Sequence, residues 1–298
     1  MKKLLTALLA VSLLLAFPSC EKETPQDASS LADTASEAVS ETVSVDPHAP
    51  LTDGEIDAFG AQFDLLNGTD CLLYTMKCKT VRTVSGVTGT DETTVLLGMK
   101  GKGNEAEVYR EESVLFQELP LSRIIYFKDG RAYYITSYAG ESEGYYTKCS
   151  YKDLFPSGET EEDLSQMRDF LTCGDVTRDE SGITVTCGAD DDLLSRTEQN
   201  FRSLGLLKDP DEGTSRELTD ASLTVSFGAD GKLASTVESL SFSAAADDTT
   251  DESVTLTVET AYASYGDGEM TVPVPENLDG YPDIEEYYEN WESGSDNN

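Results

Sequence analysis

The stretch RIIYFKDGRAYYITSY (residues 123–138) decides the fold class. Two runs rich in aromatic and β-branched residues flank Asp129-Gly130. Such runs are typical of strands, and an Asp-Gly pair between them favours a tight turn because both of its central positions need a positive φ. The stretch therefore predicts a β-hairpin and, with it, an antiparallel sheet.

The same pattern recurs elsewhere along the chain. ASLTVSFGADGKLASTVESLSF (221–242) turns at Asp230-Gly231, and its apolar residues alternate with polar ones, as a sheet with one solvated face requires. Pro273 and Pro275 restrict 270–278 to a sheet edge or an exit path. Strands are also expected where β-forming residues gather or alternate, at 71–81, 93–100, 105–110, 113–118, 144–155, 175–187 (a small hairpin) and 252–265.

Three helices interrupt these strands. Thr52 and Glu55 form a capping box that predicts a helix over 52–67. Thr160 and Asp190 are N-cap residues for two more helices. Apolar residues at helical spacing mark the buried faces: Ile56, Phe59, Phe63 and Leu66 in the first helix, Leu164, Met167, Phe170 and Leu171 in the second, and Leu193, Leu194, Phe201 and Leu204 in the third.

The N-terminus has the pattern of an export signal. Two lysines precede an uncharged, mostly apolar run over 4–17, shorter than the about 20 residues that a membrane-spanning helix needs. Phe17-Pro18-Ser19-Cys20 resembles a bacterial lipobox, from which Phe17 and Pro18 depart. We expect 1–19 to be a lipoprotein signal peptide and Cys20 to carry a lipid such as palmitate. The alternative is cleavage near Ser19 that leaves a free thiol.

Composition divides the rest of the chain into three parts. Residues 20–50 are mostly Ser, Thr, Ala, Pro and acidic residues, too polar to offset the entropy of folding, so we expect a disordered tether. Residues 51–282 have the composition and length of one globular domain. Residues 283–298 form an acidic tail. In it Ile284, Tyr287, Tyr288 and Trp291 either make a helix face that docks on the domain or belong to a frayed end.

The order of these elements (signal, tether, helix, antiparallel strands, paired helices, and closing strands with VPVPENL at 272–278) resembles the LolA/LppX-like lipoproteins of bacterial envelopes. The resemblance covers about 51–280. It implies an α+β fold in which a strongly curved antiparallel sheet, a half-barrel, has helices packed on its concave face. It also implies a space between sheet and helices that takes up a lipid or another apolar ligand.

The charge balance and the residue inventory argue against several function classes. A net charge of −36 repels phosphate backbones, so we expect no nucleic-acid partner. The only histidine, His48, precedes the domain, which leaves catalytic triads and zinc sites without their usual residue. Acidic clusters at 190–192, 209–213 and 247–252 lack the spacing of a calcium-binding EF-hand loop. We therefore expect that the protein is not an enzyme and that it has no cofactor and no metal site.

Five cysteines follow Cys20. Cys173 and Cys187 come almost opposite each other in the hairpin expected over 175–187, near the about 5.5–6 Å between Cα atoms that a disulfide prefers. An exported protein also meets a compartment in which disulfides form. Cys173–Cys187 is therefore the candidate disulfide. The alternative is that all five are buried, reduced thiols.

A tyrosine cluster around the 123–138 hairpin offers a candidate ligand face. Tyrosines pack as cross-strand pairs in sheets, which is one explanation of the cluster. The other is an amphipathic surface that lines a groove for an apolar or sugar-like ligand. The candidate residues are Tyr126, Tyr133, Tyr134, Tyr138, Tyr145 and Tyr146.

Two hypotheses for function follow from these observations. The first is a binding protein, lipid-anchored on the outer face of the bacterial cell membrane, with an apolar ligand between sheet and helices. The second is an envelope protein-interaction or sensor module with a filled core and no small-molecule ligand. An apolar cavity above about 300 Å³ would favour the first hypothesis, and a solid core would favour the second.

Overall fold

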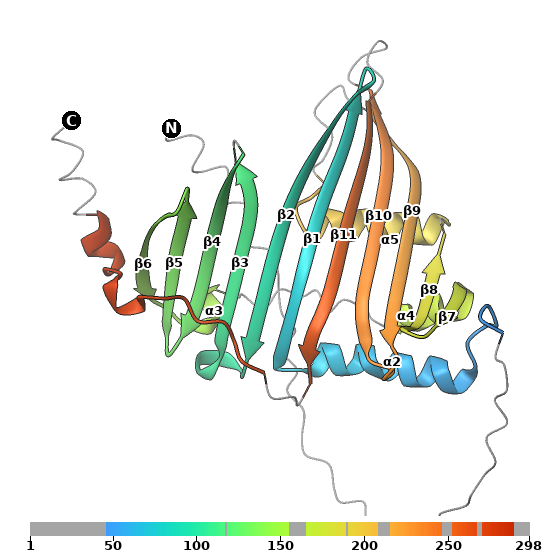
Figure 1. Ribbon diagram of the computed structural model, residues 1–298, viewed down its shortest axis with the longest axis horizontal. Coiled ribbons are helices and arrows are strands. Elements are labelled where there is room, and N and C mark those ends of the chain that lie inside the picture. The colour runs from blue at the N-terminus through green and yellow to red at the C-terminus, as the bar shows by residue number, and fades with distance from the viewer. Residues whose placement is uncertain are drawn as a thin grey trace, which may run out of the picture.

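A computed structural model describes residues 46–116, 118–154, 165–188, 190–207, 215–245, 252–266 and 270–288. Within these ranges eleven strands form one antiparallel sheet in the order β6-β5-β4-β3-β2-β1-β11-β10-β9-β8-β7 (Figure 1). The strands are β1 (Cys71–Val84), β2 (Val87–Lys100), β3 (Glu107–Phe116), β4 (Leu119–Lys128), β5 (Arg131–Tyr138), β6 (Glu141–Lys148), β7 (Asp175–Asp179), β8 (Gly182–Cys187), β9 (Ser215–Gly228), β10 (Leu233–Ala245) and β11 (Glu252–Tyr265).

One helix precedes the first strand, and the other three lie between strands in the sequence. They are α2 (Asp53–Gly68), α3 (Tyr151–Leu154), α4 (Ser165–Cys173) and α5 (Asp191–Ser203), with 3-10 turns η1 (Gly103–Glu105) and η2 (Leu278–Gly280). The capping box of α2 is confirmed, because the Thr52 hydroxyl accepts from Glu55 N–H and the Glu55 carboxylate accepts from Thr52 N–H. Asp190 caps α5 as predicted. In the described residues no helix is long and apolar enough to cross a membrane.

The sheet consists of two meanders joined through β1 and β11. Consecutive strands from β1 to β6 are neighbours in the sheet, and so are consecutive strands from β7 to β11, although α5 lies between β8 and β9 in the chain. β1 pairs with β11 from Leu72 to Val84. The predicted turn at Asp129-Gly130 is confirmed, with φ of 52° and 71° at the two residues. Residues 105–118, expected as two strands, contain the single strand β3.

The predicted half-barrel with helices packed on its concave face is wrong. The described strands form an open sheet with β6 and β7 at opposite ends. Eleven strands spaced about 4.8 Å apart are roughly 48 Å wide, whereas α2, the longest described helix with 16 residues, extends only about 24 Å. The described helices are therefore too few and too short to cover the sheet.

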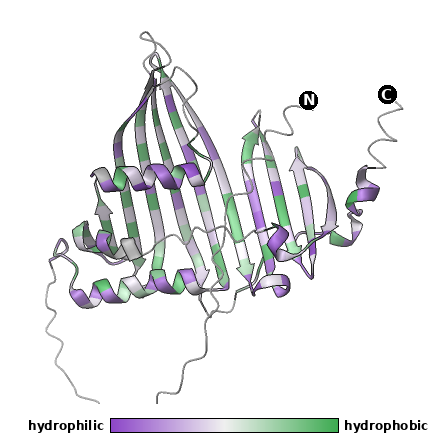
Figure 2. Cartoon of the chain, turned by 180° about the vertical axis from the view of Figure 1, so that it is seen from behind, coloured by the Kyte–Doolittle hydropathy of each residue, from purple (hydrophilic) through white to green (hydrophobic). Residues whose placement is uncertain are grey.

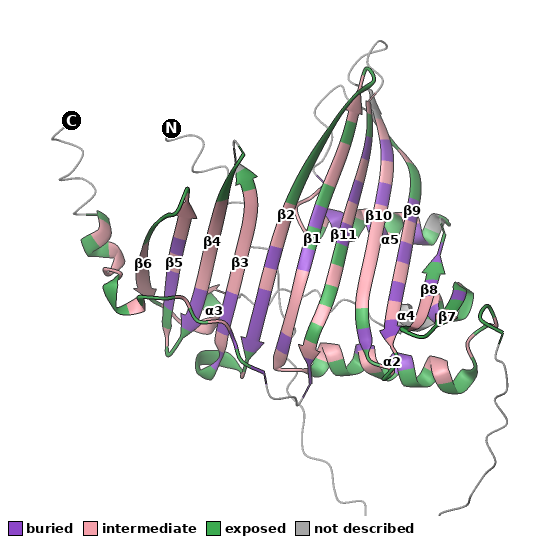
Figure 3. Cartoon of the chain, viewed as in Figure 1, coloured by how far each residue is buried: buried purple, intermediate pink, exposed green. Residues whose placement is uncertain are grey.

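α2, α4 and α5 cover one half of one face, and the short α3 lies over the other half, where the Tyr151 ring meets Phe127 of β4 at 5.9 Å. α2, α4 and α5 contact strands β8, β9 and β10, and Figure 2 shows hydrophilic and hydrophobic residues alternating along α2 and α5. The Phe59 ring of α2 stacks on Phe227 of β9 with centroids 3.9 Å apart, and Phe63 meets the same ring edge-on at 6.0 Å. All three side chains are buried, and Figure 3 shows further buried positions along β9, β10 and β11. This is the main core of the domain.

A second, smaller core lies on the opposite face. Residues 270–283, which we call the C-terminal strap, run across β2 to β6 (Figure 1). Met270 and Val272 of the strap are buried with residues that point away from the helices: Tyr109, Tyr126, Tyr133 and Ile135. Gly98 of β2 makes room for the strap, since a Cβ there would lie 3.1 Å from the Pro273 ring.

Chain segments outside the sheet contact both edge strands. At one edge Tyr146 N–H of β6 donates to Pro282 O (3.0 Å). At the other, Arg178 N–H of β7 donates to Pro47 O (2.9 Å) and His48 Nδ1 lies 3.2 Å from Val176 O. Paired edges are protected from unwanted strand addition. Residues 46–50, the end of the predicted tether, thus lie against the domain, and residues 20–45 fall outside the described ranges.

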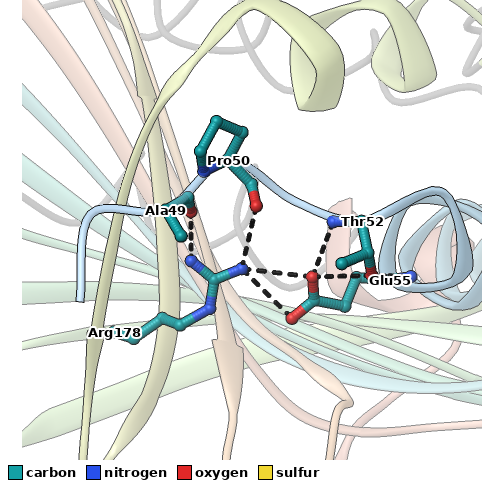
Figure 4. Close-up of polar contacts among 5 residues, drawn as sticks. All are labelled: Ala49, Pro50, Thr52, Glu55 and Arg178. Carbon is teal, nitrogen blue, oxygen red and sulfur yellow. Dashed lines mark hydrogen bonds and ion pairs between the residues drawn. The ribbon is translucent and has the colours of Figure 1, made fainter. Parts of the chain in front are cut away.

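Arg178 fastens this N-terminal segment to both β7 and α2 (Figure 4). Its guanidinium donates to Ala49 O, to Pro50 O (3.4 Å) and to both carboxylate oxygens of Glu55 (3.1 and 3.2 Å). Burial would raise the pKa of Glu55, but hydrogen bonds from Thr52 and Arg178 outweigh it and lower that pKa. We call this group of contacts the Arg178 clamp.

Candidate ligand-binding site

A cavity of about 230 Å³ lies between the helices and the sheet. α2 and α5 bound it on one side, and the inward-facing residues of β1, β2, β10 and β11 bound it on the other. The described lining consists of Phe63, Leu66, Asn67, Thr69, Leu72, Tyr74, Met76, Met99, Arg196, Asn200, Leu204, Thr236, Glu238, Val258, Thr260 and Tyr262.

The apolar part of the lining follows from the pattern of α2 and β1. Phe63 and Leu66 lie three residues apart and so share one face of α2, while Leu72, Tyr74 and Met76 alternate along the inward face of β1. Tyr265 anchors the wall, because its hydroxyl accepts from Leu233 N–H (2.7 Å) and donates to Gln62 Oε1 (2.8 Å). Burial raises the pKa of Tyr265, so this hydroxyl stays protonated.

The polar part comes from α5 and from a change of residue type along β10. Leu240 and Phe242 are buried on the inward face of β10, but Thr236 and Glu238 take the inward positions that precede them along the strand. Asn200 of α5 donates to the Glu238 carboxylate (Nδ2 to Oε2, 2.6 Å). The Arg196 guanidinium, one turn earlier, lies 4.6 Å from the centre of the Phe170 ring. The cavity therefore has one apolar and one polar wall.

The candidate ligand-face tyrosines are divided between the two faces of the sheet. Tyr126, Tyr133 and Tyr146 lie side by side under the strap, with ring centroids 6.1 and 5.7 Å apart. The register puts Tyr134, Tyr138 and Tyr145 on the opposite face, where Tyr134 and Tyr145 stack at 5.3 Å. All six are described, and none of them lines the cavity.

Two of the tyrosines under the strap, Tyr126 and Tyr109, donate to carboxylates. Tyr126 donates to Glu107 Oε1 (2.6 Å), which also accepts from Lys128 Nζ (3.0 Å). Burial, assisted by the Glu107 carboxylate, raises the pKa of the Tyr126 hydroxyl. Tyr109 donates to Glu111 (2.7 Å) in the same way. On the other face burial raises the pKa of Tyr134 to about 12. These side chains stabilise the sheet.

The acidic tail begins beside the Tyr145 ring. Tyr287 and Tyr288 lie 5.0 and 6.4 Å from that ring, centroid to centroid. The described part of the tail therefore matches the docking alternative. Trp291 lies outside the described residues.

Cys173 and Cys187 are near each other, and both are free thiols in the structure. Cys187 is buried and its Sγ donates to Phe170 O (3.4 Å). Burial, with Cys173 close by, raises the pKa of the Cys187 thiol. The Cys173–Cys187 disulfide remains a prediction. Cys20, the expected lipidation site, lies outside the described residues.

No metal-binding arrangement is present in the described part of the chain, where no group of three or more His, Cys, Asp or Glu side chains is placed to hold an ion. Two of the acidic clusters noted in the sequence, 209–213 and 247–252, lie wholly or largely outside the described residues.

Sequence reasoning expected a space between sheet and helices but missed the residues that line it, because they come from five distant segments. Thr236, Glu238 and Thr260 stand at inward positions that an apolar residue would normally occupy. That departure was a signal. It could be interpreted only with the strand register, which follows from pairings between distant parts of the chain.

Comparisons with known proteins add little. No family model matches the chain, and no curated protein does. Among solved structures the chain is similar to a DUF1329 family protein from Desulfovibrio piger, with 9% sequence identity and a TM-score of 0.14, over 76% of this chain and 96% of that one. A TM-score this low carries no argument, and the resemblance to LolA/LppX-like lipoproteins stays a prediction.

Proposed function

We propose that this protein is a lipid-anchored, extracytoplasmic binding protein that holds a small amphipathic ligand between its helices and its sheet. The observation that carries the proposal is the cavity with one apolar and one polar wall. Small-molecule sites are concave and mostly apolar, with a few polar groups that fix the orientation of the ligand. Phe63, Leu66 and Met76 would contact the apolar part, and Asn200 and Glu238 the polar part.

The size of the cavity limits the ligand. At about 230 Å³ it falls short of the roughly 300 Å³ at which sites for drug-sized ligands begin. The proposal is therefore a smaller molecule, or one chain of a larger one, rather than a whole lipid. The cavity does not reach the about 300 Å³ expected for the binding hypothesis. It supports the binding of a smaller ligand because the space between helices and sheet is not filled by side chains.

The cellular location in this proposal rests on the sequence. The apolar run before Cys20, the lipobox-like segment and the polar stretch that follows support attachment to the outer face of the bacterial membrane through Cys20. Labelled palmitate should be retained by the wild-type chain and lost in Cys20→Ala. Equal labelling of the two would refute the anchor.

Ligand binding is tested with a matched pair of cavity and surface variants. Thr260 lines the cavity, whereas Thr257 on the same strand points to the opposite face, and both are half-buried. Thr260→Phe should fill the cavity and Thr257→Phe should not. The probe is N-phenyl-1-naphthylamine, whose fluorescence rises in apolar sites.

The wild type and Thr257→Phe should enhance the probe fluorescence, and Thr260→Phe should not. Native mass spectrometry of the full chain purified from cells would then detect the natural ligand in the same two proteins. If all three proteins enhance the probe equally, the cavity is not its site and the proposal fails.

A further inference from the structure

The charges that face the cavity are balanced. Its described lining includes one cation, Arg196, and one anion, Glu238, in a chain whose net charge is −36. The cavity wall therefore differs from the acidic character of the whole chain, and the long-range attraction of cations to this protein does not describe what the cavity itself prefers.

Both charges already have partners in the protein. The Glu238 carboxylate accepts from Asn200 Nδ2 at 2.6 Å. The Arg196 guanidinium lies over the Phe170 ring at 4.6 Å, where the negative face of the ring attracts it. Both side chains are partly buried. Because they line one small cavity, an ion that pairs with one of them would also be desolvated near the like charge of the other.

The polar wall nevertheless offers both hydrogen-bond donors and acceptors. The hydroxyls of Thr236 and Thr260 can do either, Asn200 brings an amide, and Glu238 accepts. A head group that is neutral overall can satisfy such a wall without an unfavourable charge contact. A cation would lie near the like charge of Arg196, and an anion would lie near the like charge of Glu238.

We infer that the ligand is a single-chain amphiphile whose head group carries no net charge. This inference rests on the proposed function and adds the ligand class to it. The head lies against Asn200 and Glu238, and the chain lies against Phe63, Leu66 and Met76.

Three probes with the same ten-carbon chain test the inference: decyldimethylamine N-oxide, which has no net charge, decyltrimethylammonium, and decyl sulfate. Each is titrated below its micelle-forming concentration into the full chain, followed by calorimetry, at 0.15 M and 0.5 M NaCl. The higher salt screens the attraction of the cation to the acidic surface. At 0.5 M the amine oxide should bind about tenfold more tightly than either ion, since an unpaired buried charge is costly.

Charge variants then assign this preference to the cavity. Glu238→Gln should move the preference toward decyl sulfate, and Arg196→Gln toward decyltrimethylammonium. Glu259→Gln, on the opposite face of β11, is the matched control and should leave the ranking unchanged. Circular dichroism checks the fold of each variant, and the ranking with the wild type alone decides the question if Arg196→Gln does not fold.

The outcomes separate the two levels of the proposal. If none of the three probes binds, the proposed function itself fails. If one of the ions binds most tightly at 0.5 M NaCl, or if Glu238→Gln leaves the ranking unchanged, the binding function stands and the neutral head group is refuted.

Discussion

The two halves of the sheet are covered in different ways. Helices lie over β8, β9 and β10, whereas the strap lies over β2 to β6 on the other face. A helix with its side chains is about 10 Å across and contacts a sheet through long side chains, between which space can remain. An extended strap lies directly on the strands. The cavity lies between α2 and α5 on one side and β10, β11, β1 and β2 on the other, and the strap-covered half holds closely packed tyrosines.

The difference shows how one sheet can combine a binding site with a rigid scaffold. In the helix-covered half, burial depends on aromatic rings such as Phe227. In the strap-covered half, buried tyrosines carry hydroxyls that need partners, and Glu107 and Glu111 supply them. We therefore expect the first half to be sensitive to lost volume and the second to lost hydrogen bonds.

The largest effect should come from the helix-covered half. Phe227→Ala removes the ring on which both Phe59 and Phe63 pack, and we expect it to lower the free energy of unfolding by about 3–5 kcal/mol. Urea denaturation measures the change. Val237→Ala, on the outward face of β10, is the control. A loss below about 1 kcal/mol for Phe227→Ala would show that the helices do not depend on this ring.

The next effect should come from the edge of the same half. Arg178→Ala removes the Arg178 clamp and leaves Glu55 without its cation, so we expect a loss of about 2 kcal/mol and faster proteolysis between residues 46 and 50. Arg202→Ala breaks a partly exposed pair with Glu198 on the surface of α5 and should cost less than about 1 kcal/mol. Equal protease resistance of wild type and Arg178→Ala would contradict the clamp.

In the strap-covered half a single hydroxyl should matter. Tyr126→Phe keeps the ring but removes the donor to Glu107, and we expect a loss of about 1.5 kcal/mol. Tyr288→Phe, at a ring that is 52% exposed, should change the free energy of unfolding by less than about 0.5 kcal/mol. If the two variants are equally stable, the hydroxyl of Tyr126 contributes nothing.

The smallest effect is a pH dependence in the same place. Burial would raise the pKa of Glu107, but the hydrogen bonds from Tyr126 and Lys128 prevail and lower it. A carboxyl with a pKa below its unfolded value, about 4.3, stabilises the fold above that pH and loses this contribution as the pH falls through the folded pKa.

Glu107→Gln should therefore be less stable than the wild type by about 1 kcal/mol at pH 7, and the difference should shrink below pH 4. Comparing the two proteins cancels the effect of the many other carboxylates. A difference that stays constant from pH 7 to pH 3 would show that Glu107 does not contribute through its charge.

Local sequence signals predicted the local structure well. The Asp-Gly turn at 129–130, the capping box of Thr52 and Glu55, and the Asp190 cap are confirmed, because each depends on residues within a few positions of one another. The polar end of β2, at 87–92, was missed since its exposed Thr, Gly and acidic residues do not resemble a strand. There the long partner β1 imposes the conformation.

The arrangement of the elements could not be predicted in the same way. The half-barrel was wrong because nothing local fixes how far a sheet curves or how much of it the helices reach. The pairing of β1 with β11 joins residues nearly 200 positions apart, and it alone brings Met76 opposite Thr260 in the cavity wall. The strap was expected at an edge or on an exit path, and its proline-rich sequence gave no sign that it would cross five strands.

The Arg178 clamp also has a mechanical consequence. A chain pulled from its N-terminal side transmits the tension first to residues 46–50, where several hydrogen bonds converge on one guanidinium. These bonds must give way together, and the load passes into the edge of the sheet at β7 as well as into α2. α2, which lines the cavity, therefore carries only part of a pull on the chain that precedes it.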